Sequence, residues 1–498
     1  MIFLYGPPAS GKTTLGKRLA QAVGWHFVDL DEEIVKTAGR AIRDFFATDG
    51  ESAFRKLEGE TLIRVGETAE ANTIVALGGG TLLAPANRAF AEAHGLIWCL
   101  EAPSPEERAR RIAAGGDVRP LGDKAIERAP HYASFPSRIA ATFDLPGSLV
   151  IVGRSLGNPD IFANVVVADE NAARAVFPSS KVESPKSKVV SRDAEHSTCA
   201  KPIVSQKKIT ESLDEGHSTF DIRHSTLLPS GERFKTLNTV TSIWRFFGDR
   251  GIGRRDRVAA FGGGVTGDLT GFAAATWMRG VAWVNYPTTL LSMVDASTGG
   301  KTGCDLPEGK NLIGAFHAPV LVVIDADRLA TLPPRELRCG RAEMIKHEII
   351  SGRMGTGTSA DIPSPTEIAE NLAVKVGIVR EDPFERTGRR LLLNCGHTVG
   401  HAVEIATNFA VSHGEAVAIG CVEEARLAVR MGLAAPEWPD ELAARFAAVG
   451  LPTTLLNGLT FDALIPLMRG DKKRTGNTVT FALPCGNGDV RAVTVDLG

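Results

Sequence analysis

The sequence is poor in the features that mark membrane, secreted and nucleic-acid-binding proteins. Its 7 cysteines are scattered without a CxxC pair, so we expect neither a disulfide framework nor a thiolate zinc site. No apolar run reaches the ~18–20 residues that cross a bilayer, and no basic leader opens the chain. The 56 basic and 58 acidic side chains nearly cancel, which excludes a global attraction to nucleic acid or to an acidic membrane. We therefore expect a cytoplasmic protein with small-molecule substrates.

The chain of 498 residues is long enough for about three domains. Short apolar strands, such as Ile2–Tyr5 and Leu96–Leu100, alternate with amphipathic helices, which predicts a parallel sheet with helices on both faces. This α/β pattern returns later and then gives way to mainly helical periodicity. A Ser-, Lys- and Glu-rich segment at 178–219 has no aromatic residue and predicts a mobile insertion. We expect α/β parts at 1–146 and 147–330 and a helical part at 331–498.

A phosphate-binding loop follows the first predicted strand. Residues 6–13 match GxxxxGK[ST] and open a helix, which is the context that gives this motif its meaning. Backbone N–H groups of such a loop surround a phosphate, and the helix N-terminus adds positive charge. Lys12 is placed to reach the β- and γ-phosphates, and the Thr13 hydroxyl to ligate Mg²⁺. The loop predicts ATP and Mg²⁺ as ligands.

The acceptor side of this first site is indicated by residues that follow the loop. Asp29 and Asp31 end the second strand segment, Arg55 follows, and glycines 78–80 end another strand. With Arg119 and Arg128, this constellation resembles shikimate kinase over residues 1–145. Ala9 stands where that family often has a glycine. Bidentate guanidinium groups suit a small carboxylate acceptor, and phosphoryl transfer needs positioning and positive charge.

The resemblance to shikimate kinase implies a role for each matching residue. Asp31 would take the proton of the acceptor hydroxyl or orient that hydroxyl, and Arg119 would stabilise the transferring phosphoryl group, so both are expected to be catalytic. Asp29 would help to hold the Mg²⁺ water shell. The residues expected at ATP and Mg²⁺ are Gly6, Gly11, Lys12, Thr13, Thr14, Asp29 and Arg111. Those expected at shikimate are Asp31, Arg55, Gly78, Gly79, Gly80 and Arg128.

A second glycine cluster and a set of histidines point to another site. Glycines 262–264 follow a buried strand segment, as in a dinucleotide pyrophosphate site. Downstream, Glu343 precedes His397 and His401, which are spaced i, i+4 on one helix face. His413 begins another helix. One carboxylate and two imidazoles leave an open position on a zinc-like ion, which is the catalytic pattern, and spacing alone favours the i, i+4 pair.

From about residue 149 to the C-terminus the sequence resembles 3-dehydroquinate synthase. The resemblance implies Zn²⁺ or Co²⁺ on Glu343, His397 and His413, so the i, i+4 pair is not the metal pair. The expected catalytic residues are His401, Lys346 and Glu385. The expected NAD-binding residues are Asp169, Asn171, Glu232, Lys235, Gly263, Gly264, Val265, Asp268, Thr288, Thr289 and Lys310. The expected heptulosonate-phosphate-binding residues are Arg279, Asp295, Lys301, Asn311, Lys346, Lys375, Arg390, Asn394, His401 and Lys472.

The implied reaction starts from 3-deoxy-D-arabino-heptulosonate 7-phosphate. A ring hydroxyl is oxidised by NAD⁺, phosphate is eliminated, the ketone is reduced again, and an aldol step closes the carbocycle. By the same resemblance, Arg279 would reach the substrate phosphate bound in a neighbouring subunit. We therefore expect a homodimer that forms through the part of the chain that resembles 3-dehydroquinate synthase. Arg386 stands where the family has an acidic residue, with Glu385 one step away; either a one-residue shift places Glu385, or that role is altered.

The sequence therefore predicts a fused bifunctional enzyme of the shikimate pathway. The two steps are not consecutive, so channelling between the sites is not implied. One alternative is another sugar-phosphate cyclase, against which Lys301, Asn311 and Arg390 argue because they suit a carboxylated substrate. The other alternative makes the first part a non-catalytic nucleotide-binding regulator. That alternative is disfavoured by the presence of the whole set Lys12, Asp31, Arg55 and Arg119.

Overall fold

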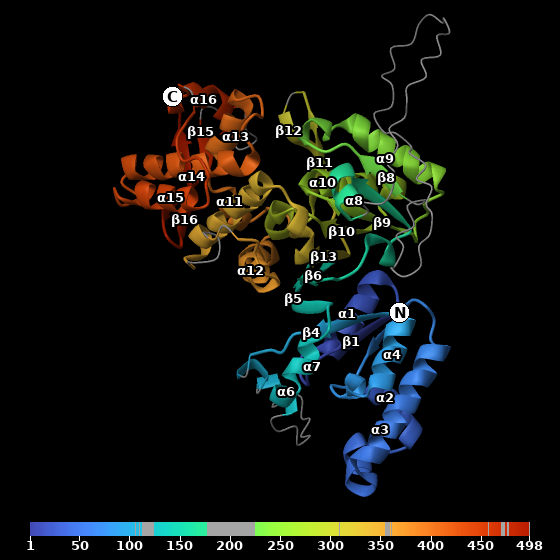
Figure 1. The fold of residues 1–498 in the computed structure, drawn as a ribbon. Coiled ribbons are helices and arrows are strands. Elements are labelled where there is room, and N and C mark those ends of the chain that lie inside the picture. The colour runs from blue at the N-terminus through green and yellow to red at the C-terminus, as the bar shows by residue number, and fades with distance from the viewer. Residues whose placement is uncertain are drawn as a thin grey trace, which may run out of the picture. The chain divides into compact units, whose positions relative to one another are not determined.

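The computed structural model describes residues 1–104, 106–108, 110–111, 124–176, 225–307, 309–353, 359, 361–456, 458–469, 474–475 and 478–497. The predicted insertion at 178–219, Arg119 and Lys472 lie outside these residues. The chain forms two compact units, Met1–Asp144 with Ser148–Asn158, and Leu145–Gly147 with Pro159–Gly498 (Figure 1). The first unit thus takes in Ser148–Asn158, beyond the boundary that the sequence suggests at residue 146.

The first unit is built on a sheet of order β2-β3-β1-β4-β5-β6. Strand β1 pairs in parallel with both β3 and β4, and all four of its residues are buried, as expected for a central parallel strand. Helices α1 and α4 lie alongside these strands in Figure 1. The strands are β1 (Ile2–Tyr5), β2 (His26–Asp29), β3 (Thr73–Ala76), β4 (Leu96–Leu100), β5 (Arg138–Leu145) and β6 (Ser148–Arg154). The helices are α1 (Lys12–Val23), α2 (Leu30–Ala38), α3 (Ile42–Thr68), α4 (Pro85–His94), α6 (Lys124–Glu127) and α7 (Ala129–Ala133).

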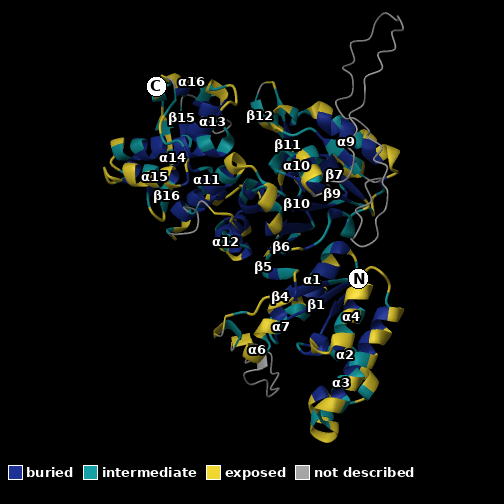
Figure 2. Cartoon of the chain, in the orientation of Figure 1, coloured by how far each residue is buried: buried dark blue, intermediate teal, exposed yellow. Residues whose placement is uncertain are grey.

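The second unit opens with a parallel sheet of order β13-β10-β9-β7-β8. Its central strands are almost wholly buried, and they are dark blue in Figure 2. The strands are β7 (Val165–Asp169), β8 (Ser225–Leu228), β9 (Arg257–Gly262), β10 (Ala282–Pro287) and β13 (Leu321–Asp325), with a separate antiparallel pair β11 (Lys301–Leu306) and β12 (Gly309–Phe316). The helices are α8 (Glu170–Val176), α9 (Leu237–Asp249) and α10 (Gly264–Thr276), with short turns η4 (Glu232–Phe234), η5 (Trp277–Arg279) and η6 (Ser292–Ala296).

The rest of the second unit is mainly helical, as the sequence predicts. Its helices are α11 (Pro334–Ser351), α12 (Pro365–Glu381), α13 (His397–Ala406), α14 (His413–Arg430), α15 (Trp438–Ala448) and α16 (Phe461–Met468), with the turn η8 (Arg389–Asn394) before α13. This region also holds an antiparallel sheet of β14 (Arg474–Thr475), β15 (Thr478–Gly486) and β16 (Asp489–Asp496). Phe481 and Leu483 of β15 join Ala416 and Ile419 of α14 in one apolar core, so the sheet supports the helices.

Glycines let the helices of this region approach closely. A Cβ at Gly420 would lie 2.0 Å from the carbonyl oxygen of Gly396, and one at Gly414 would lie 2.4 Å from that of Cys339. Only glycine fits such gaps, so these positions fix the distance between α14 and both α13 and α11. The first residues of α13 and α14 are histidines, and this packing brings them near α11. None of the helices among the described residues is both long and apolar enough to cross a membrane.

Candidate active sites

The phosphate loop joins the end of β1 to the start of α1. Gly6 and Gly11 have φ of 135° and 93°, in the left-handed region that favours glycine, and no side chain caps α1. The N–H groups of its first turn therefore remain for a phosphate. Lys12 Nζ donates to the carbonyl oxygens of Gly6 and Pro7, at 2.9 Å each, which folds the lysine back over the loop. Ala9 adopts φ 60°, so the alanine that replaces a glycine here carries backbone strain.

The predicted Mg²⁺ residues meet beside the loop. Thr13 Oγ1 donates to Asp29 Oδ2 at 2.7 Å, which places both side chains where they can share a hydrated cation. The other oxygen of Asp29 accepts from the backbone N–H of Asp31 at 3.0 Å and caps α2. This cap puts Asp31 in the first turn of α2, and a Cβ at Gly78 would lie 3.3 Å from its Oδ1. Asp31 thus faces the glycine run at the end of β3.

The predicted carboxylate clamp is held by a glutamate that the sequence did not single out. Arg55 Nη1 donates to Glu58 Oε2 at 2.7 Å, and Thr81 Oγ1 donates to Glu58 Oε1 at 2.7 Å. Glu58 is 1% exposed, and burial raises its pKa although Arg55 opposes that shift. Gly80 lies against the same guanidinium, since a Cβ there would stand 2.7 Å from Arg55 Nη1. Tyr132 Oη closes the site by donating to the carbonyl oxygen of Gly79 at 2.7 Å.

In the second unit, Glu343, His397 and His413 meet from α11, α13 and α14; we call them the tripod. One ligand atom from each lies within 4.8 Å of the others. Glu343 Oε1 stands 3.7 Å from His397 Nε2 and 3.5 Å from His413 Nε2. Both carboxylate oxygens of Glu343 are buried, and the carboxylate pairs with the Lys346 ammonium. Two imidazoles around a buried carboxylate fit a divalent cation.

The two tripod histidines have different electrostatic surroundings. His397 Nδ1 faces the carbonyl oxygen of Cys395 at 3.1 Å, and burial lowers its pKa well below the usual value. A neutral ring that donates through Nδ1 leaves Nε2 free as a ligand. Burial would lower the pKa of His413 too, but its contacts with Glu343 and Glu404 raise it to about 10. A cation that binds the tripod must therefore displace a proton from His413.

A second charged cluster surrounds Asp295 next to the tripod. Asp295 Oδ1 lies 2.8 Å from Lys375 Nζ and 3.8 Å from Lys346 Nζ. Burial would raise the pKa of Asp295, but the two ammonium groups lower it well below its usual value. Arg390 completes the cluster by donating to the carbonyl oxygen of Gly299 at 2.9 Å. This concentration of buried cations suits a substrate that carries phosphate and carboxylate groups.

The predicted dinucleotide residues gather at the carboxyl ends of parallel strands. Asp169 ends β7 and accepts from the backbone N–H of Asn171 at 2.9 Å. The glycines at 262–264 end β9 and open α10, and the N–H of Thr288, after β10, donates to the Gly262 carbonyl at 2.9 Å. Ligands of open α/β sheets bind at this edge. Nearby, Lys235 Nζ lies 2.6 Å from Asp268 Oδ2 and 2.7 Å from Asn311 Oδ1.

Glu385, the acidic residue one position before Arg386, contacts Lys301, which is predicted to bind the substrate. Glu385 Oε2 lies 2.8 Å from Lys301 Nζ, and the Glu385 backbone adopts φ 57°. The guanidinium of Arg386 instead lies 5.5 Å from the centre of the Phe384 ring. Glu385, one residue from the expected position, is thus the acid that faces Lys301. Its catalytic role stays a prediction.

Family models cover most of the chain. The model described as shikimate kinase matches residues 8–138. The models for the N-terminal and C-terminal parts of 3-dehydroquinate synthase match 225–339 and 340–474. The 3-dehydroquinate synthase of Synechococcus sp. is 47% identical over 276 residues, which are 53% of this chain and 75% of that protein. That of Thermosynechococcus vestitus is 46% identical over 279 residues, 53% of this chain and 74% of that protein.

The chain belongs to the 3-dehydroquinate synthase family. It also carries a shikimate kinase domain, so the predicted fusion of two enzymes is confirmed, and the reading with a different cyclase and a non-catalytic regulator is not favoured. We call the first unit the kinase unit and the second the synthase unit.

Solved structures share the fold of the synthase unit. One is 2-deoxy-scyllo-inosose synthase with carbaglucose-6-phosphate, NAD⁺ and Co²⁺, with a TM-score of 0.56 and 23% identity over 72% of this chain and 97% of that chain. Another is 2-epi-5-epi-valiolone synthase from Streptomyces hygroscopicus with NAD⁺ and Zn²⁺, with a TM-score of 0.54 and 24% identity over 72% of this chain and 95% of that chain. The predicted α/β fold is confirmed.

Other predicted site residues differ in their exposure and in their contacts. Thr14 is exposed on α1, while Arg111 Nη1 donates to the Ala9 carbonyl in the phosphate loop at 3.2 Å. Arg128 precedes α7 as its N-cap residue. In the synthase unit, Arg279 is exposed at the end of η5, and Asn394 is half-buried at the end of η8.

Glu424 is a buried residue of the synthase unit that sequence reasoning missed. Its Oε2 accepts from the Gly396 N–H at 2.8 Å, and its Oε1 accepts from those of Thr398 and Val399 at 3.1 Å each. These bonds satisfy the N-terminus of α13 from a neighbouring helix and fix His397, its first residue. An acidic residue inside an Ala-rich helix gives no local signal of this role.

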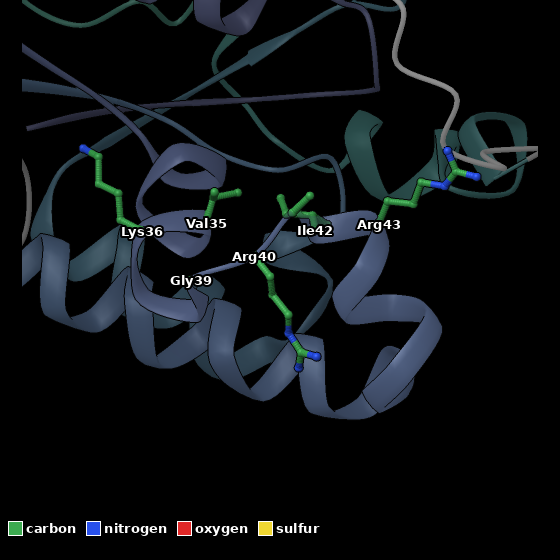
Figure 3. Close-up of a pocket in the computed structure, with 7 residues that line it drawn as sticks. Val35, Lys36, Gly39, Arg40, Ile42 and Arg43 are labelled. Atoms are coloured by element: carbon green, nitrogen blue, oxygen red, sulfur yellow. The ribbon is translucent and has the colours of Figure 1, made fainter.

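A surface hollow of about 620 Å³ lies at the turn between α2 and α3 of the kinase unit (Figure 3). It is lined by Val35, Lys36, Gly39, Arg40, Ala41, Ile42 and Arg43. No residue predicted for any of the sites lines this hollow. Its basic side chains are already engaged in part, since Lys36 Nζ lies 2.7 Å from Glu33 Oε1 and Arg40 pairs with Asp49.

Proposed function

We propose that the kinase unit transfers the γ-phosphoryl group of ATP to the 3-hydroxyl of shikimate. We propose further that the synthase unit converts 3-deoxy-D-arabino-heptulosonate 7-phosphate to 3-dehydroquinate with release of phosphate. The observation that carries the second proposal is the tripod, whose buried carboxylate stands beside the buried Lys346, Lys375 and Arg390. The tripod would bind a cation, and the neighbouring ammonium and guanidinium groups would bind anions. This pair of sites suits a substrate whose hydroxyl is oxidised while its phosphate and carboxylate groups are held in place.

In the kinase unit, the chain's residues position the reactants. Lys12 and the loop N–H groups bind the phosphates of ATP, and Thr13 and Asp29 would hold Mg²⁺, which would neutralise charge on the phosphates. Arg55, oriented by Glu58, grips the shikimate carboxylate through a bidentate guanidinium contact. Asp31, facing the glycines after β3, takes the proton of the attacking hydroxyl.

In the synthase unit, Glu343, His397 and His413 would hold Zn²⁺ or Co²⁺, and the edge formed by β7, β9 and β10 would hold NAD. When bound, NAD accepts and returns a hydride, and the cation polarises the oxygen at the reacting carbon. Lys346, Lys375 and Arg390 bind the anionic groups of the substrate. His401 moves a proton next to the tripod; its ring centre lies 5.4 Å from that of His397.

We propose a cytoplasmic homodimer, joined through the synthase unit, with neither nucleic acid nor a membrane as partner. The exposed Arg279 supports a dimer, because the family resemblance assigns its side chain to a neighbouring subunit's phosphate site. The described cysteines are buried and free, which suits a reducing compartment. The net charge of −2 supports small-molecule ligands.

The proposal is tested with two assays on one purified chain. ADP formation is expected to require shikimate and Mg²⁺, and phosphate release is expected to require the heptulosonate phosphate, NAD and a divalent cation. The matching heptulose 7-phosphate without a carboxylate serves as the comparison substrate. Preferential turnover of that uncarboxylated sugar phosphate would contradict the proposed substrate and favour another cyclase activity.

Replacement of Gly80 by alanine is expected to weaken shikimate binding. The new Cβ would stand 2.7–2.9 Å from three atoms of the Arg55 guanidinium, so the guanidinium must move away from its present position. Loss of one charge-assisted contact costs about 1.5–3 kcal/mol, so the KM for shikimate should rise roughly 10- to 100-fold. Steady-state kinetics checks this, with an unchanged KM for ATP as the internal control; an unchanged KM for shikimate would show that Arg55 does not hold the carboxylate.

The synthase is expected to lose substrate affinity as the pH rises through about 8. Burial, helped by Arg390, lowers the pKa of Lys375 to about 8 although Asp295 opposes the shift. Below that pH Lys375 is an ammonium ion that attracts an anionic substrate, and above it the side chain is neutral. Consequently kcat/KM should fall up to about tenfold per pH unit above 8. In Lys375→Arg this alkaline limb should move to higher pH, because a guanidinium stays protonated; a limb that does not move would assign it to another group.

A further inference from the structure

Glu404 is a buried carboxylate of α13 that none of the roles above uses. It is 3% exposed, and its Oε1 lies 3.5 Å from Nδ1 of His413. The opposite ring nitrogen of His413, Nε2, lies 3.5 Å from Glu343 Oε1 in the tripod. The imidazole is therefore held between two carboxylates, one on the cation side and one behind it.

Lys310 holds Glu404 from the cofactor side of the synthase unit. Its Nζ, on β12, lies 3.3 Å from Glu404 Oε1 and 3.3 Å from Glu232 Oε1. The same ammonium stands 4.9 Å from the ring centre of Phe409, just after α13. These contacts give a chain of alternating charges from Glu232 through Lys310 and Glu404 to His413. Glu404 cannot swing away from His413 without leaving Lys310.

We propose that Glu404 is a positioning residue for the metal ligand His413. It accepts a hydrogen bond from Nδ1–H, which fixes the neutral tautomer and points the Nε2 lone pair at the cation held by Glu343 and His397. Carboxylates that orient ligating histidines in this way typically contribute about 10- to 100-fold in metal affinity. Lys310 keeps the carboxylate in place. The inference rests on the proposed metal site of the synthase unit.

A second role for Glu404, as a direct ligand of the cation, can be distinguished from the positioning role. His401, Glu404 and His413 also bring ligand atoms within 4.8 Å of one another, so Glu404 could itself be a ligand. A ligand that is removed abolishes binding at its site, whereas a positioning group that is removed weakens binding and changes the ligand field. The two roles therefore predict different results for the isosteric variant Glu404→Gln.

The test uses the full-length chain freed of metal and reconstituted with Co²⁺, whose visible absorption reports coordination. In Glu404→Gln the Co²⁺ affinity is expected to fall about 10- to 100-fold with a shifted visible band, measured at a temperature at which the apo chain is folded. Glu370→Gln, an exposed glutamate on α12, serves as the control and should match the wild type. Lys310→Met leaves Glu404 in place but unanchored, so a fall of several-fold is expected there and keeps the test decisive if Glu404→Gln does not fold.

Wild-type affinity together with a wild-type spectrum in Glu404→Gln would overturn the positioning role and leave the metal site intact. Complete loss of Co²⁺ binding in a folded Glu404→Gln chain would also overturn it, since Glu404 would then be a ligand. A wild-type chain that gives no Co²⁺ band would overturn the metal site itself. These outcomes distinguish a wrong role for Glu404 from a wrong assignment of the metal site.

Discussion

Glu343→Gln is expected to abolish metal binding and synthase turnover while shikimate kinase activity stays at the wild-type level. The Glu343 side chain is fully buried, and the change removes the negative charge of the tripod without altering its size. It also removes one of the two carboxylates that pair with the buried Lys346, leaving Asp295 at 3.8 Å, so some loss of stability is expected as well. Loss of the group that stabilises the developing charge should lower kcat by at least about 10²–10³-fold.

Metal content after dialysis and phosphate release are the two measurements for this variant. Glu336→Gln changes an exposed glutamate of the same helix and is the matched control, expected to retain both metal and activity. Kinase turnover in the same preparation shows that the chain is folded and that its concentration is correct. A Glu343→Gln chain that keeps its metal and releases phosphate at the wild-type rate would remove Glu343 from the site.

Asp31→Asn is expected to lose kinase activity and to keep synthase activity, the reverse of Glu343→Gln. The amide cannot take the proton of the shikimate hydroxyl, and loss of a general base lowers turnover by about 10²–10⁴-fold. Asp29 should still cap α2, because its bond to the backbone N–H of residue 31 does not involve that side chain. ADP formation at saturating ATP and shikimate measures the loss, and phosphate release by the synthase unit should be unchanged.

Asp44→Asn provides the control for the kinase unit, because Asp44 is an exposed aspartate in the first turn of α3. Its ADP formation should equal that of the wild type. If Asp31→Asn retained most of its kinase turnover, Asp31 would only orient the acceptor, and the proton would have to leave by another route.

The phosphate loop could be predicted from the sequence because it is local. Residues 6–13 carry the whole motif between one strand and one helix, and Lys12 donates to carbonyls of the same loop. The metal ligands are a different case, because spacing alone favoured His397 with His401. His413 joins His397 through the packing of α13 on α14, which depends on Gly420 and Gly414 meeting distant backbone. A local pattern does not contain that information, and only the family resemblance supplied it.

Three buried glutamates show where sequence reasoning stopped. Glu58, Glu404 and Glu424 lie in helices of mixed composition, where an acidic residue ordinarily faces water. Each is buried because its partners come from elsewhere: Thr81 for Glu58, Lys310 for Glu404, and the N-terminus of α13 for Glu424. Residues that orient other residues are set by tertiary contacts, so a motif that names the reacting groups leaves them out.

Phosphate release shows whether one chain carries a metal-dependent synthase together with a kinase. Purified protein with NAD is given 3-deoxy-D-arabino-heptulosonate 7-phosphate, first as prepared, then with a chelator, then with Zn²⁺ added back. We predict release that the chelator stops and Zn²⁺ restores, while kinase activity with ample Mg²⁺ is unchanged. Release that persists in the metal-free chain, or no release from the chain supplied with NAD and Zn²⁺, would contradict a metal-dependent dehydroquinate synthase.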